Sequence, residues 1–294
     1  MDEKILIALI SAITSILVVF IFKPIADSGF HLFKLKQDYK SEQRRKVKVA
    51  LAENKGKLLK SAEELNHRLW NFQENVSYNW HYVNGNYRIE NYYIQSFVYR
   101  ILSFYANIKI LEDKLIFFDG TVATSKDMQM IKFFRLFQEC FCDLFLFENI
   151  EYNKNIAKDH LFKGQLDNTI DAMIHNGQII SFSEFQSKTV IDKSFDYMFC
   201  FIDSISPNEN RLRWGRIAII HLTTIAFLNS FGYDFQYTNK TKIKKLFILY
   251  TQNSNLEIFT TIINNFRNIL SRYKMKDREC NLNSVWFLFL LNHN

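Results

Sequence analysis

The chain has 294 residues, of which 48% are hydrophobic and 16% aromatic, and it carries a net charge of +7 at pH 7. A chain of this length and composition has enough apolar surface to bury a core, so it is expected to fold. Two prolines and eight glycines are too few for a turn-rich β architecture, and four scattered cysteines are too few for a disulfide scaffold. We therefore expect a mostly α-helical protein in a reducing compartment.

The N-terminal region contains an apolar stretch, from Ile5 to Phe22, without a charged residue in 18 positions. As a helix it would be about 27 Å long, close to the hydrocarbon thickness of a bilayer. A secretory signal peptide is the alternative, but residues 1–4 contain two acids and Phe22-Lys23-Pro24 offers no small residues for cleavage. Residues 5–22 are therefore predicted to be a retained transmembrane anchor.

Basic residues dominate the segment after the anchor, where the acidic residues are Asp27, Asp38 and Glu42. By the positive-inside rule, this segment and the body that follows lie in the cytoplasm. The prediction is a single-pass protein of the bacterial inner membrane, with its N-terminus outside. The basic residues are Lys23, Lys34, Lys36, Lys40, Arg44, Arg45, Lys46 and Lys48.

Small residues form one face of the anchor, because Ala8, Ser11, Ala12 and Ser15 recur at helical spacing, with Thr14 nearby. Such residues allow transmembrane helices to approach closely. Copies of the helix would then associate into a homo-oligomer in the lipid bilayer, or line a narrow polar path through it. A plain tether is the alternative interpretation, and both stay open.

Residues 23–76 are predicted to form a basic juxtamembrane segment and a long amphipathic helix from His31 to Gln73. Pro24 and Gly29 are expected to interrupt the helix between the anchor and this segment. A seam of apolar residues at heptad spacing serves either packing within a bundle or self-association of anchored chains. The seam consists of Leu51, Leu58, Leu65 and Phe72, with Ala62, Leu69 and Val76 as the companion row.

Residues 77–294 are predicted to form a cytoplasmic helical domain. Thr124 and Asp127 form a capping-box pattern at the start of one helix, after a turn at Asp119-Gly120. The uncharged stretch 217–231 is short for a membrane span and is expected to be a buried helix, with a re-entrant segment as the alternative. Helices are expected over residues 90–117, 125–149, 166–175, 183–205 and 256–276, and an apolar segment over 286–291.

Aromatic residues gather around the Asn84-Gly85 turn, and we expect some of them to contact a ligand. Aromatic side chains among cations can stack the bases of single-stranded nucleic acid. The aromatic residues of the helix over 90–117 follow helical spacing and are expected in the core instead. The candidates for ligand contact are Tyr78, Trp80, Tyr82, Tyr87 and Arg88.

Two further basic clusters lie far from the anchor in the sequence. They could bind a phosphate-rich ligand such as single-stranded DNA or a nucleotide, and a solvated charged face is the alternative. The first cluster consists of Arg211, Arg213, Trp214 and Arg216, and the second of Lys240, Lys242, Lys244 and Lys245, beside Tyr233, Phe235 and Tyr237.

No H-E-x-x-H, G-x-S-x-G or Walker-type motif is present, so we do not expect an enzyme. Cys140-x-Cys142 is more typical of a core pair than of a metal site, and we expect no metal or cofactor. Arg216 and His221 do fit the R-x4-H spacing of HEPN ribonucleases. This resemblance implies a dimeric, metal-independent ribonuclease with both residues at the cleavage site, which is kept as a third hypothesis.

The N-terminal anchor, the size and helicity of the body and its basic charge together resemble the layout of membrane effectors of bacterial anti-phage defence. Among these, the channel-forming component of Hailong is held shut by DNA oligomers that a partner nucleotidyltransferase makes. The resemblance implies a homo-oligomeric ion channel, an oligonucleotide ligand and abortive infection on activation. The alternative is a membrane-tethered scaffold or nucleic-acid-binding module that recruits a partner.

Overall fold

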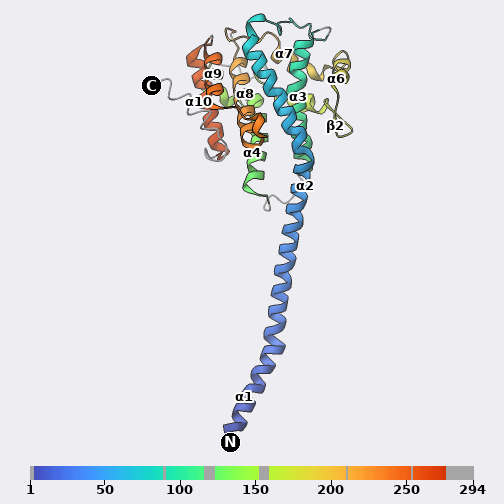
Figure 1. The fold of residues 1–294 in the computed structure, drawn as a ribbon, viewed down its shortest axis with the longest axis vertical. Coiled ribbons are helices and arrows are strands. Elements are labelled where there is room, and N and C mark those ends of the chain that lie inside the picture. The colour runs from blue at the N-terminus through green and yellow to red at the C-terminus, as the bar shows by residue number, and fades with distance from the viewer. Residues whose placement is uncertain are drawn as a thin grey trace. The chain divides into compact units, whose positions relative to one another are not determined.

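The computed structural model describes residues 3–88, 91–115, 123–151, 159–209, 211–252 and 254–275. Within these residues it contains ten α-helices and one pair of two-residue strands, which confirms the mostly α-helical fold (Figure 1). The chain divides into two units, Met1–Ala50 with Phe117–Ala123 and Leu51–Ile116 with Thr124–Asn294. The division falls inside helix α2 (Lys23–Asn75), which contributes residues to both units.

The N-terminal unit begins with helix α1 (Glu3–Leu17), which is followed directly by a π-helical turn, η1 (Val18–Phe22), and by α2. The stretch Glu3–Phe20 is long and apolar enough to cross a membrane, and none of it is buried within the protein. The part of the chain that the structure describes therefore contains one candidate membrane span, at the N-terminal position that the sequence predicts.

The expected interruption at Pro24 and Gly29 is wrong, because α2 runs through both residues. Pro24 is the second residue of α2, which continues directly from η1, so its missing N–H falls inside a continuous helix. The turn before it is π-helical, with the N–H of Lys23 donating to the carbonyl of Val18 five residues earlier. This wider turn changes the hydrogen-bond register where proline, without an N–H, would leave a carbonyl unpaired.

The heptad seam of α2 packs inside the larger unit. Leu58, Leu65 and Phe72 are completely buried, as are Ala62 and Leu69 of the companion row. The two outer members, Leu51 and Val76, are partly buried against the same core. Packing within the bundle, one of the two predicted uses of the seam, is therefore confirmed from residue 58 to residue 72.

After α2, the helices of the larger unit pack around a single hydrophobic core. Helix α8 contacts α4 and α10, whereas α3 contacts α5 and α7. The elements are η2 (Val76–Tyr78), α3 (Tyr92–Leu115), α4 (Ser125–Cys142), η4 (Leu144–Phe147), α5 (Lys163–Asp171), β1 (Ile174–His175), β2 (Gln178–Ile179), α6 (Phe182–Thr189), η5 (Lys193–Phe195), α7 (Asp196–Ile202), α8 (Arg213–Phe231), η6 (Asp234–Gln236), α9 (Lys240–Thr251) and α10 (Leu256–Arg272).

The predicted start of α4 is confirmed, since the N–H of Asp127 donates to Thr124 Oγ1 at 3.2 Å and the N–H of Thr124 donates to Asp127 Oδ2 at 2.9 Å. This helix ends at Cys142 and not at residue 149, because the Asp143 carboxylate accepts from the N–H of Phe145 and starts a 3-10 turn. The turn predicted at residues 119–120 and the apolar segment 286–291 lie outside the described residues.

The single helix expected over residues 183–205 is wrong, because the structure has α6, η5 and α7 in its place. Asp192 causes the break, since its carboxylate accepts from the N–H of Ser194 at 2.8 Å and caps a new helical segment. The helix expected over 166–175 begins earlier and ends at Asp171. A two-strand hairpin replaces its last turn, with Asn176 and Gly177 both at positive φ.

Helix α8 lies in the core, which confirms the buried-helix prediction for residues 217–231. All its residues from Arg213 to Leu228 are buried. Gly215 allows a close approach to α10, because an added Cβ would lie 2.6 Å from Cδ1 of Ile262. The helix ends at Phe231, and Gly232 is its C-cap.

Candidate functional site

Exposed aromatic residues and two arginines gather where α2 ends and α3 begins. We call this the aromatic–arginine surface and define it as Arg68, Tyr78, Trp80, Tyr92, Tyr93, Ser96 and Arg100. The side chains of Tyr78 and Trp80 are 65% and 49% exposed and stack on each other, with ring centroids 5.1 Å apart and planes 12° apart. Trp80 also meets Tyr93 edge-on at 5.4 Å. Two of the predicted ligand contacts, Tyr78 and Trp80, are therefore accessible and adjacent.

The two arginines converge on one serine. Arg68 Nη2 donates to Ser96 Oγ at 2.8 Å, and Arg100 Nη1 donates to the same hydroxyl and to the Ser96 carbonyl. The guanidinium of Arg68 also lies 4.8 Å from the centroid of the Tyr93 ring. Neither arginine forms an ion pair within the described residues.

The proximity of these two cations has an electrostatic cost. Burial lowers the pKa of Arg68, and the positive charge of Arg100 lowers it further. The nearest acidic residue along α2, Glu64, lies 4.0 Å from Lys60. Two adjacent guanidinium groups without a carboxylate form a favourable place for an anion, and a guanidinium binds phosphate oxygens in a planar, bidentate geometry.

The other predicted residues of this region have structural contacts. Tyr82 is partly exposed and meets His81 edge-on. Tyr87 is buried and stacks on Phe199 at 4.6 Å, and burial raises its pKa to about 12. Arg88 is ion-paired with Asp196 at 2.6 Å. The prediction of ligand contact is therefore corrected for Tyr87, which belongs to the core.

The Asn84-Gly85 turn is held by one carboxylate. Asp203 accepts hydrogen bonds from the N–H groups of Val83, Asn84 and Gly85 at 3.0, 3.3 and 2.7 Å. The ring of His81 donates to the carbonyl of Ile205 at 2.6 Å. The turn is thereby fixed to the segment that connects α7 to α8.

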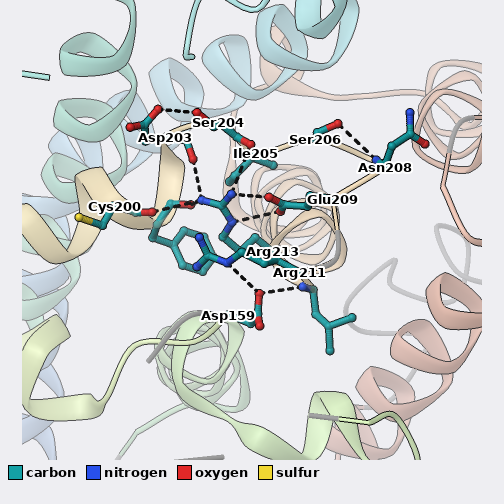
Figure 2. Close-up of polar contacts among 12 residues, drawn as sticks. Asp159, Cys200, Asp203, Ser204, Ile205, Ser206, Asn208, Glu209, Arg211 and Arg213 are labelled. Atoms are coloured by element: carbon teal, nitrogen blue, oxygen red, sulfur yellow. Dashed lines mark hydrogen bonds and ion pairs between the residues drawn. The ribbon is translucent and has the colours of Figure 1, made fainter. Parts of the chain in front are cut away.

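The first basic cluster is a structural network and not a ligand surface. Figure 2 shows Arg213 among Cys200, Asp203, Ser204 and Glu209. Its buried guanidinium pairs with Glu209 and donates to the carbonyls of Cys200, Phe201, Asp203 and Ser204 at 3.1, 2.7, 2.7 and 3.3 Å. Arg211, beside it, pairs with Asp159 at 3.4 Å.

The rest of this cluster is also buried. Trp214 Nε1 donates to the carbonyl of Tyr250 at 3.0 Å. Arg216 donates to the carbonyls of Cys140 and Asp143 at 2.9 and 2.8 Å, and lies over the Phe147 ring. Because Arg213, Trp214 and Arg216 are buried, their predicted role in ligand binding is corrected to a role in the core.

Burial also removes the basis of the ribonuclease hypothesis. Arg216 and His221 are both completely buried in α8, so neither reaches a surface where RNA could bind. His221 Nδ1 lies 3.2 Å from the hydroxyl of Tyr250, and burial lowers its pKa to about 3. The R-x4-H spacing in this chain is therefore a feature of a core helix.

The second basic cluster is exposed on the first turns of α9. Asn239 caps this helix, since its side chain accepts from the N–H of Lys242 at 2.9 Å. Lys245 pairs with Glu74 of α2 at 3.0 Å. Lys242 and Lys245 line a pocket of about 320 Å³, whereas Lys240 and Lys244 are exposed outside it.

The cysteine pair of α4 lies in or beside the core. Cys140 is buried, with its Sγ 3.8 Å from Thr223 Oγ1, and burial raises the pKa of both Cys140 and Cys142 to about 12. In the residues that the structure describes, no group of three or more His, Cys, Asp or Glu side chains is placed to hold a metal ion.

The small-residue face of the predicted anchor, Ala8, Ser11, Ala12 and Ser15 with Thr14, is exposed along α1. Thr14 Oγ1 donates to the carbonyl of Ile10, and Ser15 Oγ donates to the carbonyl of Ser11, both at 2.8 Å. The two hydroxyls are thus satisfied within their own helix.

Sequence reasoning missed Arg68 and Ser96 as members of a site. Arg68 falls between the buried seam residues Leu65 and Leu69, where a charge indicates only a solvated helix face. No family model matches the chain, and comparisons with curated proteins and with solved structures find no match either.

Proposed function

We propose that the protein is a membrane-anchored effector whose helical domain binds a nucleotide or single-stranded oligonucleotide and thereby controls the association of its anchors into a channel. The anchor holds the chain in the bacterial inner membrane, and the domain lies in the cytoplasm. A partner enzyme makes the ligand. The layout of anchor and basic helical body, which resembles that of Hailong-type effectors, supports a role in anti-phage defence.

The aromatic–arginine surface is the observation that supports a nucleotide or single-stranded oligonucleotide as the ligand. Arg68 and Arg100 meet at Ser96 without a carboxylate, and an anion would remove their mutual repulsion. The exposed pair of Tyr78 and Trp80 beside them offers a ring face on which a base can stack. Stacking on an aromatic side chain contributes about 1–3 kcal/mol per base. Phosphate and base are thus both accommodated by neighbouring groups.

Helix α2 supports a link between ligand binding and the membrane. Arg68 belongs to α2, and α2 begins directly after the apolar span and the π turn. A ligand on Arg68 therefore acts on the same helix that connects the domain to the anchor. The small-residue face with Ser11, Thr14 and Ser15 is the surface through which anchors would then pack.

A membrane-tethered binding module is the second candidate, and one observation favours it. The hydroxyls of Thr14 and Ser15 are hydrogen-bonded within α1, so the helix needs no partner to satisfy them in lipid. In this case the ligand site is the same, and nothing passes through the membrane.

Binding is tested on the detergent-solubilised full chain by fluorescence anisotropy with a labelled single-stranded oligonucleotide. We expect Trp80→Ala, and the double variant Arg68→Gln with Arg100→Gln, to weaken binding by about tenfold or more. The double variant should also reduce the slope of log affinity against log salt by about 1.4. The control is Lys48→Gln with Lys57→Gln, which removes the same charge from exposed positions of α2 that form no ion pair within the described residues. Equal weakening by the control would show that only net charge matters, and would contradict the proposal.

The channel is tested separately in bacteria with a voltage-sensitive dye. Wild-type protein is expected to depolarise the membrane when the ligand no longer holds it shut. Changing Ser11, Thr14 and Ser15 all to Leu should abolish this effect while oligonucleotide binding remains. Binding without depolarisation in the wild type would favour the tethered module.

A further inference from the structure

A pocket of about 320 Å³ lies between α2 and the segment from Gly232 to Thr238 that connects α8 to α9. It is separate from the aromatic–arginine surface in its residues, because none of its lining residues belongs to that surface. Its volume is at the lower end of the range for small-molecule sites, which is about 300–1,000 Å³. Eight of its twelve lining residues are polar or charged, and three are aromatic, Trp70 from α2 and Phe235 and Tyr237 from the connecting segment.

One polar group in this pocket lacks a partner. Asn66 lines the pocket and is only 6% exposed, and its Oδ1 has no hydrogen-bond partner in the described residues. A buried amide oxygen without a donor is unfavourable, so native proteins rarely keep one without a reason. A ligand that donates an N–H to Asn66 would satisfy it.

Two charged residues of the pocket, Lys242 of α9 and Glu63 of α2, form no ion pair within the described residues. Lys245 is paired with Glu74 at 3.0 Å, and Glu63 accepts from the side-chain amide of Gln236 at 2.9 Å. His67 and Tyr237, the remaining titratable residues of the lining, are exposed. One anionic group on a ligand would complement Lys242.

The connecting segment is held in place without a ligand. Asn229 of α8 donates its amide to the carbonyl of Thr238 at 3.0 Å and accepts from the N–H of Thr238 at 2.8 Å. The Gln236 side chain accepts from the N–H of Tyr233 at 3.0 Å. Gly232 permits this path, since an added Cβ would lie 2.5 Å from the carbonyl of Leu228. A wall that is already ordered loses little entropy on binding.

The rim of the pocket presents an aromatic residue to solvent. Phe235 is 75% exposed and stacks on Tyr233, with ring centroids 5.5 Å apart. Exposed phenylalanine is costly in water, and a planar ligand between Phe235 and Trp70 would cover it.

We propose that this pocket binds a small planar aromatic or heterocyclic molecule that has a ring N–H donor and one anionic group. The ring lies against Trp70 and Phe235, its N–H donates to Asn66 Oδ1, and its anionic group pairs with Lys242. Because α2 forms one wall and the α8–α9 connection the other, the bound molecule joins these two elements. The site is independent of the oligonucleotide surface and of the channel.

The test uses the full chain in detergent with two probes that each carry a ring N–H, guanosine 5′-monophosphate for a phosphate source and indole-3-acetate for a carboxylate source. We expect at least one probe to raise the melting temperature by a few degrees and to give saturable binding in calorimetry. Lys242→Gln should weaken that binding by tenfold or more. Lys240→Gln, which removes the same charge outside the pocket, should leave it within twofold. Binding of neither probe, or equal weakening by both lysine variants, overturns the proposal.

Asn66→Leu distinguishes a ligand site from a structural defect. Leucine has a similar size and lacks the unpaired amide, so this variant should melt at or above the wild-type temperature without ligand. It should also lose the shift that the effective probe gives in the wild type. Unchanged probe affinity in a folded Asn66→Leu variant overturns the assignment. If the same variant still binds the oligonucleotide, then losing the ligand of this pocket does not remove the proposed function.

Discussion

The indole ring of Trp70 in α2 meets the imidazole ring of His221 in α8 edge-on, with the ring centroids 5.2 Å apart. His221 is completely buried, and its Nε2 has no hydrogen-bond partner in the described residues. Burial lowers its pKa from 6.5 to about 3, because the charged form would lose its hydration. The contact therefore depends on a histidine that stays neutral.

This histidine should make the stability of the domain depend on pH. Between pH 6.5 and pH 3 the unfolded chain binds a proton at His221 that the folded chain does not. The free energy of unfolding is therefore expected to fall as the pH falls through this range, by up to about 1.4 kcal/mol per pH unit. Above pH 6.5 the contribution of His221 is constant. Urea unfolding of the solubilised chain at pH 7 and pH 5 measures the difference.

His221→Phe provides the control, since it keeps a ring against Trp70 but cannot titrate. Its pH dependence should be weaker than that of the wild type by the amount that His221 contributes. Burial also lowers the pKa of His81 and of His160, so some dependence remains. An unchanged difference between pH 7 and pH 5 in this variant would contradict the assignment to His221.

Arg213→Gln is expected to destabilise the domain by about 3–5 kcal/mol. The change leaves Glu209 buried without its ion-pair partner and removes the donor for the carbonyls of Cys200, Phe201, Asp203 and Ser204. Arg135→Gln is the matched control: it breaks an exposed pair with Glu112 at 3.6 Å, which should cost about 1 kcal/mol or less. Equal losses for both variants in urea unfolding would refute a special role for Arg213.

Two glycines with equal space around them should respond to alanine with opposite signs. Neither Gly85 nor Gly56 has an atom within 4 Å of an added Cβ. Gly85 has a φ of +84° in the turn that Asp203 holds, so Gly85→Ala should cost about 1 kcal/mol of stability. Gly56 lies inside α2, and Gly56→Ala should add about 0.5–1 kcal/mol. Shifts of the same sign in thermal unfolding would rule out backbone conformation as the cause.

The cysteines should differ strongly in reactivity. Cys200 is exposed, whereas burial raises the pKa of Cys140 and Cys142 to about 12. Because the thiolate reacts and its fraction falls tenfold per pKa unit, N-ethylmaleimide at neutral pH should modify Cys140 about a thousandfold more slowly than an ordinary thiol. Peptide mass spectrometry at timed intervals measures each site. Similar rates for Cys140 and Cys200 are expected only after unfolding in urea. Similar rates in the folded protein would contradict the burial of Cys140.

Local patterns predicted the parts of the fold that local interactions determine. The capping box at Thr124 and the seam from Leu58 to Phe72 were both readable, because caps and helical faces depend on residues a few positions apart. The break at Asp192 was missed, since an aspartate in an apolar stretch does not by itself end a helix. Its cap on Ser194 becomes visible only in the structure.

The candidate sites were less predictable for a physical reason. Arg213 and Arg216 look like surface cations in the sequence, because their partners are backbone carbonyls, which every residue has. Arg68 and Arg100 are remote in the chain and meet only because α2 and α3 pack side by side at Ser96. Tyr78 and Trp80 were found because they lie next to a turn, away from any helical pattern.

The buried face of α2 is synthesised well before the helix that covers it. Phe72 packs against Trp214 of α8, which is synthesised about 140 residues later, at about 5–20 residues per second. For roughly 7–28 s, the apolar face of α2 has been made but the helix that covers it has not. Chaperones that bind exposed apolar segments therefore have an uncovered face of α2 to bind during that interval.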